Sequence, residues 1–200
     1  MFTRINSKIV VAILFLLIVV LSGCGGGILG LQAEQNPPLN ELTLGKFDSK
    51  IKVSVPFELN AGKRINVSED IRPYILGQER LEGYNKTMGL EITNAFYDAK
   101  LVPVNWKPDL EGAADGAINS LARSPKINNF SSNKTYITVS ENPAILAKLS
   151  FYDRKILVES KILFLVDGYS LWMINTRYSQ SDEAARKLVD KILQTVMIIR

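Results

Sequence analysis

The chain contains no histidine and a single cysteine, and these shortages remove many kinds of active site. Histidine is the commonest general base near neutral pH and the commonest metal ligand. Its absence excludes a Ser-His-Asp triad, a Cys-His dyad and a zinc site built on imidazole. One cysteine excludes an internal disulfide and a cluster of paired cysteines. Catalysis by carboxylates or a lysine is left open as an alternative, but we expect no enzyme, no cofactor and no metal site.

The chain also lacks a strong excess of charge. It has 24 basic and 20 acidic residues, and two of the basic ones, Arg4 and Lys8, precede a long apolar run. Without these two, 22 basic residues remain against 20 acidic ones. The densest basic group, at residues 186–191, is interleaved with acidic residues. Nucleic-acid binding needs lysine and arginine gathered on one face, so we expect no nucleic-acid partner.

One long hydrophobic run is present, thirteen apolar residues at positions 9–21. It follows the positively charged start and is followed by the small residues Ser22 and Gly23. This order is typical of a secretory signal peptide. A membrane-spanning helix needs about 20 apolar residues. A retained anchor would have to continue through residues 25–31, which are rich in glycine and therefore poor in helix propensity.

The four residues Leu21-Ser22-Gly23-Cys24 resemble the lipobox of bacterial lipoproteins. The resemblance implies cleavage between Gly23 and Cys24 and attachment of diacylglycerol to the Cys24 thiol. Two or three acyl chains would anchor the protein firmly, whereas one chain binds a membrane marginally. The alternatives are an ordinary cysteine in a cleaved leader and a catalytic thiol. No basic neighbour is present to lower the pKa of the thiol, which disfavours catalysis.

The resemblance also predicts a cellular location and a domain organisation. Position 25 is glycine and not aspartate, so in a host with two membranes the outer membrane is allowed; in a host with one membrane the protein would stand on its outer face. We therefore expect the cell membrane or outer membrane, with the protein exposed to the periplasm or exterior. Residues 1–23 are the predicted signal peptide and residues 24–40 a Gly- and Pro-containing tether. Residues 41–200 form the predicted single domain.

Alternation of apolar and polar residues predicts strands at the start of this domain. Residues 51–57 alternate strictly, and a partner strand is expected across a turn at Asp48 and Ser49. Residues 87–97 alternate again, with one face formed by Leu90, Ile92, Asn94 and Phe96. The polar stretch between them, residues 60–85, predicts a loop with a short helix or an irregular strand.

The rest of the domain predicts two helices around four strands. Apolar residues recur at helical spacing over 110–121, after Asp109 as the expected N-cap. Strands are expected at residues 134–139, 144–152, 155–166 and 170–178. Short links, including Asp167-Gly168, make these four strands antiparallel neighbours. Residues 179–199 predict a closing amphipathic helix capped by Ser181, with Asp182 and Glu183 in its first turn.

This order of elements resembles the Mog1/PsbP-like superfamily, which includes small bacterial lipoproteins of the DcrB type. The segments that carry the resemblance are 51–59, 91–100, 113–121, 144–152, 162–178 and the closing helix. The resemblance implies an α/β fold, a three-layer α/β/α sandwich with a mainly antiparallel sheet. The superfamily consists mostly of adaptor and accessory proteins, so the likeness favours binding over catalysis.

Three groups of residues are candidates for binding. Trp106 lies in the Pro-rich segment 103–109 and could be an interface anchor or a core residue. The neighbours Glu69 and Asp70, with Glu79, Arg72 and Arg80, lack the spacing of a calcium loop and predict a solvated charged surface. The last predicted strand carries Trp172, Arg177 and Tyr178, which could line a groove, although Trp172 also suits the core.

Together these features predict an exported, lipid-anchored accessory or adaptor protein that binds a protein partner or an envelope component. The membrane is reached through the lipid at Cys24. The alternative is a lipid-anchored protein that binds a small molecule or an ion between sheet and helices. A large apolar pocket with a few polar groups would favour the alternative, and a flat exposed apolar patch would favour the adaptor.

Overall fold

The computed structural model describes residues 37–46, 49–63, 69 and 71–199, which all belong to one unit, Asn36–Arg200. The predicted signal peptide, Cys24 and most of the tether lie outside the described residues and stay predictions. The first described strand begins at Asn40. Among the described residues, no helix has the length and apolar character needed to cross a membrane.

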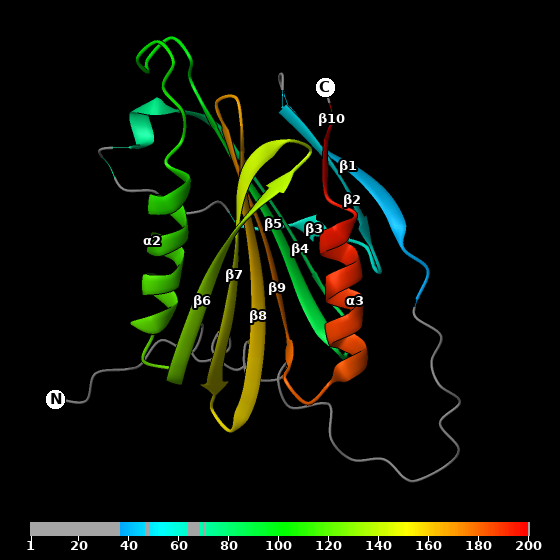
Figure 1. Ribbon diagram of the computed structural model, residues 1–200. Helices are drawn as coiled ribbons and strands as arrows, with labels where there is room; N and C mark the ends of the chain where they lie inside the picture. Colours follow the sequence, from blue (N-terminus) through cyan, green and yellow to red (C-terminus); the bar gives the residue numbers. More distant parts are fainter. Residues whose placement is uncertain (1–36, 47–48, 64–68, 70, 200) are drawn as a thin grey trace, which may run out of the picture. The chain divides into compact units, whose positions relative to one another are not determined.

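Two antiparallel sheets and two α-helices make up the described unit (Figure 1). The larger sheet has seven strands in the order β3-β4-β5-β9-β8-β7-β6. The smaller sheet has the order β1-β2-β10. The elements in chain order are β1 (Asn40–Lys46), β2 (Ser49–Val55), β3 (Asn60–Ala61), the 3-10 helix η1 (Arg72–Tyr74), β4 (Ile75–Tyr84), β5 (Met88–Tyr97), α2 (Leu110–Ala122), β6 (Ile127–Val139), β7 (Asn142–Asp153), β8 (Ile156–Asp167), β9 (Ser170–Ser179), α3 (Glu183–Gln194) and β10 (Met197–Ile199).

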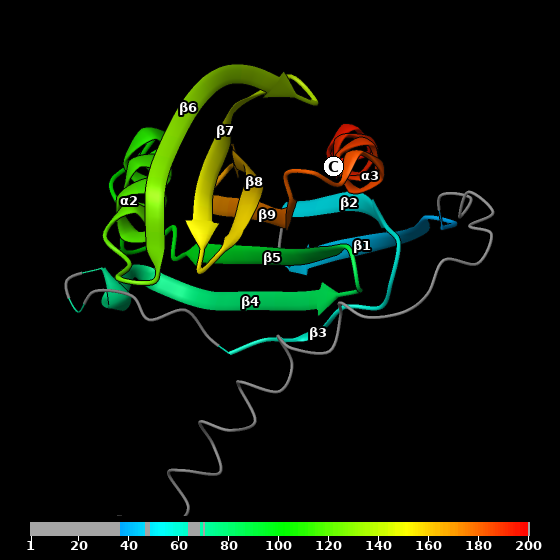
Figure 2. The ribbon, with the colours of Figure 1, turned by 90° about the horizontal axis from the view of Figure 1, so that it is seen from below.

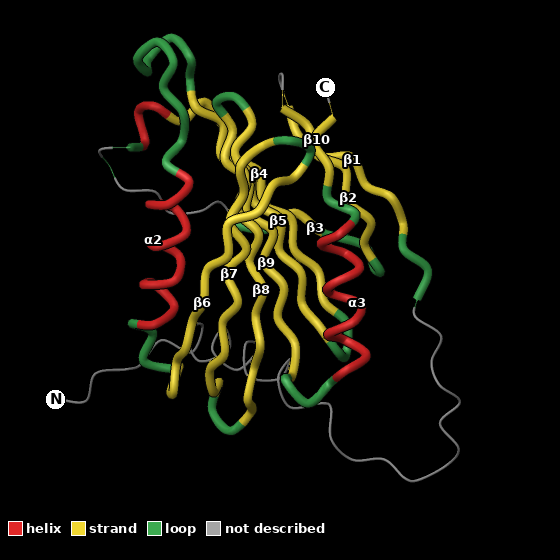
Figure 3. Tube along the Cα trace, viewed as in Figure 1, coloured by secondary structure: helices red, strands yellow, loops and turns green. Residues whose placement is uncertain are grey.

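The two helices cover opposite faces of the seven-stranded sheet (Figures 1 and 3). Helix α2 packs Ala114 and Ile118 against one face of β7 and β8. Helix α3 packs Leu188, Val189 and Ile192 on the other face. The small sheet shares that second face, because the β2 side chains belong to the same core cluster as α3. A mainly antiparallel sheet with two helices is therefore confirmed. A simple three-layer α/β/α sandwich is not, since α3 is joined by a second sheet.

The central strands need cover on both faces because β8 carries apolar side chains on both of its faces. In β8, every residue from Ser160 to Leu165 is buried. Phe164 and Ile162 face α2, whereas Leu163 and Leu165 face α3 and the small sheet. The predicted single face of β5 is also confirmed, with Leu90, Ile92, Asn94 and Phe96 all buried (relative exposure 3% or less).

Two tight hairpins join the central strands, each one residue later than predicted. Strand β8 ends at Asp167 and β9 begins at Ser170, so Gly168 and Tyr169 form the turn. Gly168 has φ +55°, a left-handed conformation that glycine adopts without a side-chain clash. The hairpin between β7 and β8 turns at Arg154 and Lys155 in the same way, with Arg154 at φ +59°.

Four further predictions differ from the structure. Residues 75–84, expected to be loop or irregular strand, form the ten-residue β4, which pairs with β5. The chain after α3 does not continue as helix, since Met197–Ile199 pair with β2. The cap of α3 is Asp182 and not Ser181: its carboxylate accepts a 2.8 Å hydrogen bond from the Ala185 amide. Figure 2 shows how β6, which begins seven residues earlier than expected, bends along its length.

Candidate functional site

A cleft of about 820 Å³ lies where η1, the segment between β5 and α2, and the first turn of α2 meet. The segment forms the loops above α2 in Figure 3. Three aromatic side chains line the cleft, Tyr74, Tyr97 and Trp106. Aliphatic side chains complete most of the wall, among them Ile71, Leu101, Val102 and Leu171. The volume lies within the range of about 300–1,000 Å³ typical of ligand sites.

Local turn chemistry places Trp106 in this cleft. The Asp98 carboxylate accepts a 2.9 Å hydrogen bond from the Lys100 amide, and this turn starts the segment. A second turn brings the Trp106 amide within 3.0 Å of the Pro103 carbonyl. Asn105, between them, has φ +66°, which asparagine tolerates better than most residues. The half-buried Trp106 therefore stands on an ordered loop.

Tyr97 and Trp106 both line the cleft, and their rings contact each other. Their ring centroids are 4.9 Å apart and the rings are tilted by 59°. Tyr97 is the last residue of β5, and its amide donates a 3.0 Å hydrogen bond to the Tyr169 carbonyl. Burial raises the pKa of the Tyr97 phenol, so this ring stays neutral across the physiological range.

Asp109 is the only acidic or basic side chain among the described residues that line the cleft. It caps α2, because its Oδ1 accepts a 2.9 Å hydrogen bond from the Gly112 amide. Gly112 also lines the cleft, and a Cβ there would lie 2.3 Å from Asp109 Oδ2. The glycine thus leaves room for an exposed carboxylate beside the aromatic rings.

The edge of the cleft exposes apolar surface. Ile71 is 40% exposed, Tyr74 44% and Leu101 55%. Singly exposed apolar residues are ordinary, but here three of them line one cleft. The cleft therefore combines a pocket-sized cavity with an apolar edge open to a larger partner.

The other predicted binding residues lie elsewhere. Trp172 is 1% exposed and lies in the core between the two sheets, as expected if it is a core residue. It has no access to a surface ligand, so the alternative prediction that Trp172 lines a binding groove is wrong. Arg177 is exposed and lines a separate hollow of about 290 Å³ beside Tyr84. Tyr178 is buried near α3. Of the four predicted binding residues, Trp106 alone reaches the cleft.

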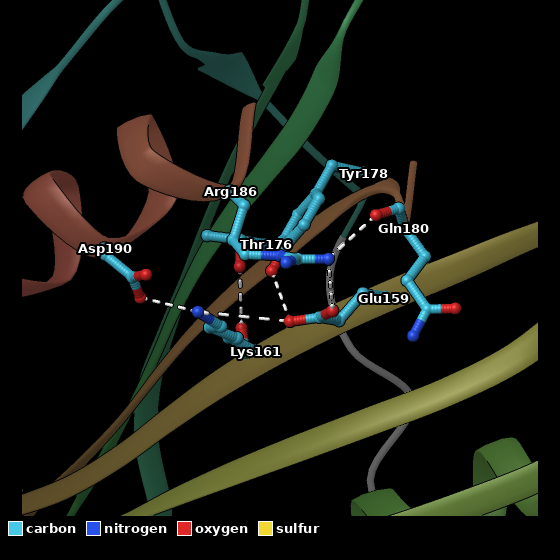
Figure 4. Close-up of polar contacts among 7 residues, drawn as sticks. All are labelled: Glu159, Lys161, Thr176, Tyr178, Gln180, Arg186 and Asp190. Carbon is cyan, nitrogen blue, oxygen red and sulfur yellow. Dashed lines mark hydrogen bonds and ion pairs between the residues drawn. The ribbon is translucent and has the colours of Figure 1, made fainter. Parts of the chain in front are cut away.

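Tyr178 belongs to a polar cluster that joins β8, β9 and α3 (Figure 4). Its hydroxyl donates a 2.5 Å hydrogen bond to Glu159. The Lys161 ammonium, whose side chain is 6% exposed, lies 2.6 Å from Asp190 and 4.0 Å from Glu159. Burial, followed by the bond to Glu159, raises the pKa of the Tyr178 phenol above its usual range. The cluster pairs its charges internally, which is typical of a structural role.

The predicted charged surface around Glu79 and Arg80 does not form one cluster in the part of the chain that the structure describes. Glu79 pairs with Lys46 at 2.9 Å. Arg80 pairs with Glu82 at 3.1 Å and with Glu91 at 3.2 Å. Asp70 lies outside the described residues. No set of three carboxylate or cysteine groups within the described ranges is placed to hold a metal ion.

Sequence reasoning identified Trp106 but missed its partners. The alternation over residues 87–97 predicts a strand that includes Tyr97 and gives it no site role, and Tyr74 lies in the polar stretch that predicts a loop. The signal that could have found Tyr97 is its position as the last residue before the chain leaves the sheet. Loops and strand ends carry binding residues more often than strand centres do.

Comparison with known proteins identifies the fold. No family model and no curated protein matches the chain. The PsbP protein of the cyanobacterium Synechocystis matches at 10% identity with a TM-score of 0.53, over 90% of this chain and 99% of that one. LpqN of Mycobacterium tuberculosis, described as involved in cell envelope biogenesis, matches at 12% identity with a TM-score of 0.48, over 81% and 92% of the two chains. The likeness to the cyanobacterial protein shows that this chain has a PsbP-like fold.

Proposed function

We propose that this chain is a lipid-anchored accessory protein of the cell envelope that binds a protein partner through the cleft around Trp106. The observation that carries the binding role is the aromatic cleft with its exposed apolar edge. An apolar edge of this kind typically marks an interaction site. The lipobox-like Leu21-Ser22-Gly23-Cys24 and the apolar run before it support export and anchoring. No catalysis is part of the proposal.

The anchor is tested by substitution of the predicted acylated residue. In cells fed an alkyne fatty acid, the full chain is expected to become labelled and to sediment with membranes. Cys24→Ala should abolish labelling and leave the leader uncleaved. Ser22→Ala, which keeps a small residue before the cysteine, is the matched control and should behave as the original chain. Equal labelling of Cys24→Ala and the original chain would show that the lipoprotein proposal is wrong.

The partner is tested by site-specific photocrosslinking in cells. A benzophenone amino acid at Leu101 places the reactive group on the cleft edge, where the side chain is 55% exposed. The same group at Tyr84, 70% exposed at the far end of β4, is the control. We expect a discrete crosslinked protein from position 101 alone. The same crosslinks from both positions, or none from position 101, would contradict partner binding at the cleft.

A second candidate function is the binding of a small molecule, and the cleft volume favours it. About 820 Å³ is enough for a drug-sized ligand. The two functions are separated by native mass spectrometry of the full chain purified from its host. A co-purifying small ligand that is lost in Trp106→Leu, together with no crosslink at position 101, would favour the second function.

A further inference from the structure

We infer that the cleft receives a cationic side chain, arginine or lysine, that is flanked by apolar residues in an extended segment of the partner protein. This inference rests on the proposed function, because it names the chemistry of the partner at the same site. It follows from three properties of the cleft: ring geometry, charge and the exposed edge.

The ring geometry leaves aromatic faces available to a cation. Tyr97 and Trp106 meet at 59° with centroids 4.9 Å apart, so the two rings form a corner and do not stack face to face. Tyr74 contributes a third ring to the lining. A cation within about 6 Å of a ring centroid is attracted to the negative face of the ring, and tryptophan attracts it most strongly.

The charge of the cleft has one sign. Asp109 carries the only ionic charge among the described lining residues, and its Oδ1 uses one acceptor position for the Gly112 amide. A carboxylate has about four acceptor positions, so several remain for an incoming donor. Lys100 and Lys107 belong to the same segment but do not line the cleft. A carboxylate beside aromatic faces is complementary to arginine or lysine.

The first turn of α2 would by itself oppose the binding of a cation, because a helix N-terminus attracts anions. Two residues of α2 line the cleft, Gly112 and Ala113. The Gly112 amide donates to the Asp109 carboxylate, and the Ala113 amide donates to the Asp109 carbonyl. The amides of the α2 residues that line the cleft are therefore already bonded, and the capping carboxylate stands beside them.

The exposed edge favours a peptide segment over a small cation. Ile71, Tyr74 and Leu101 are each between 40% and 55% exposed. A small ammonium ion held at Trp106 would leave these side chains in water. Apolar residues on either side of an arginine or lysine would cover them, and arginine also stacks its planar group on aromatic rings.

The test uses random heptapeptides displayed on phage and selected against the immobilised full chain in detergent. Trp106→Leu serves for counter-selection, so that only cleft-dependent peptides are kept. We expect enrichment of peptides with arginine or lysine between apolar residues. The best peptide is then compared with a version that has citrulline, the neutral analogue of arginine, or with norleucine in place of lysine. We expect binding to weaken about tenfold with the neutral residue, a loss between that of an exposed and that of a desolvated cation–π contact.

Asp109→Asn removes the negative charge of the cleft and keeps the helix cap, because asparagine caps a helix as well as aspartate does. The variant therefore tests the effect of the charge on peptide binding. It is expected to weaken the cationic peptide about fivefold, the upper range of an exposed ion pair, and to leave the neutral peptide unchanged. Asp182→Asn makes the same chemical change at the cap of α3 and should change neither peptide.

The outcomes distinguish the inference from the proposed function. Enrichment of purely apolar or acidic peptides that still depend on Trp106 would overturn the cationic inference and leave binding at the cleft intact. No Trp106-dependent enrichment would overturn the inference, while a crosslink from position 101 would still support partner binding. Equal binding of cationic and neutral peptides, or of Asp109→Asn and the original chain, would also overturn it.

Discussion

The Trp172 indole donates a 3.0 Å hydrogen bond to the Ser49 hydroxyl, and this bond joins the two sheets of the domain. Trp172 belongs to β9 in the seven-stranded sheet and Ser49 begins β2 in the small sheet. Both residues are buried, with 1% and 5% exposure. The indole N–H can only donate, so this contact satisfies it completely.

Ser49→Ala is expected to lower the free energy of unfolding by about 1–3 kcal/mol. The substitution leaves the buried indole N–H without an acceptor, and an unpaired buried donor costs its full desolvation. The measurement is urea denaturation followed by circular dichroism. Ser120→Ala, on the exposed face of α2, is the control and is expected to change stability by less than about 0.5 kcal/mol. Equal effects of the two substitutions would contradict the role of the Trp172 bond.

Asp190→Ala is expected to destabilise the domain by about 1–2 kcal/mol. It removes the carboxylate 2.6 Å from the buried Lys161 ammonium and leaves Glu159, 4.0 Å away, as the remaining partner. Loss of one partner of a fully buried pair typically costs about 3–5 kcal/mol, but the Asp190 side chain is 50% exposed and Glu159 remains, so the cost here lies below that range. Lys187→Ala breaks the exposed α3 pair with Glu183 and should cost under about 0.5 kcal/mol. Similar unfolding midpoints for both variants would refute the prediction.

The Tyr178 phenol is expected to weaken the fold at high pH. Burial and the bond to Glu159 raise its pKa in the folded state above the ordinary value of 10.0. Above pH 10 the unfolded chain loses this proton while the folded protein keeps it, so stability falls as pH rises. In Tyr178→Phe, the decline in unfolding free energy between pH 9 and 11 should be shallower than in the original protein. The control is Tyr84→Phe, 70% exposed, which should leave the decline unchanged.

Asp109→Ala and Asp109→Asn are expected to differ in stability. Alanine removes the acceptor of the Gly112 amide, and loss of an N-cap typically costs about 1 kcal/mol. Asparagine keeps an acceptor oxygen and should leave the unfolding midpoint nearly unchanged. Thermal denaturation of the three proteins checks this. An Asn variant as unstable as the Ala variant would show that the charge, and not the cap, stabilises α2.

The parts of the fold that sequence predicted are those where local pattern and burial agree. Strands β7, β8 and β9 are joined by two-residue turns, so each strand meets its neighbour in the chain. Helix α2 begins after its N-cap Asp109, as expected from its apolar spacing. In each case the residues that specify the element lie within it or beside it.

The parts that sequence missed have little strand pattern of their own. Strand β4 has few apolar residues. It carries three charged residues, two glycines and a glutamine, so its sequence has little strand character. It forms a strand because β5 supplies its hydrogen-bond partners. Strand β10 has three residues and exists because β2, about 145 residues earlier, lies beside the end of α3. The partner of β4 is the next strand, which begins at Met88, but the partner of β10 lies outside any local window.

The candidate site shows the same division. By itself the sequence determined the antiparallel centre of the large sheet and the position of Trp106 on a Pro-containing segment, because short-range turns and periodicity specify such features. The leader with Cys24 stays a prediction. Only the tertiary structure decided that Trp106 meets Tyr97 and Asp109 in one cleft while Trp172 is enclosed between two sheets. The local sequence makes both tryptophans plausible binding residues. They differ in burial because burial depends on which elements pack over each side chain, and that is a property of the whole fold.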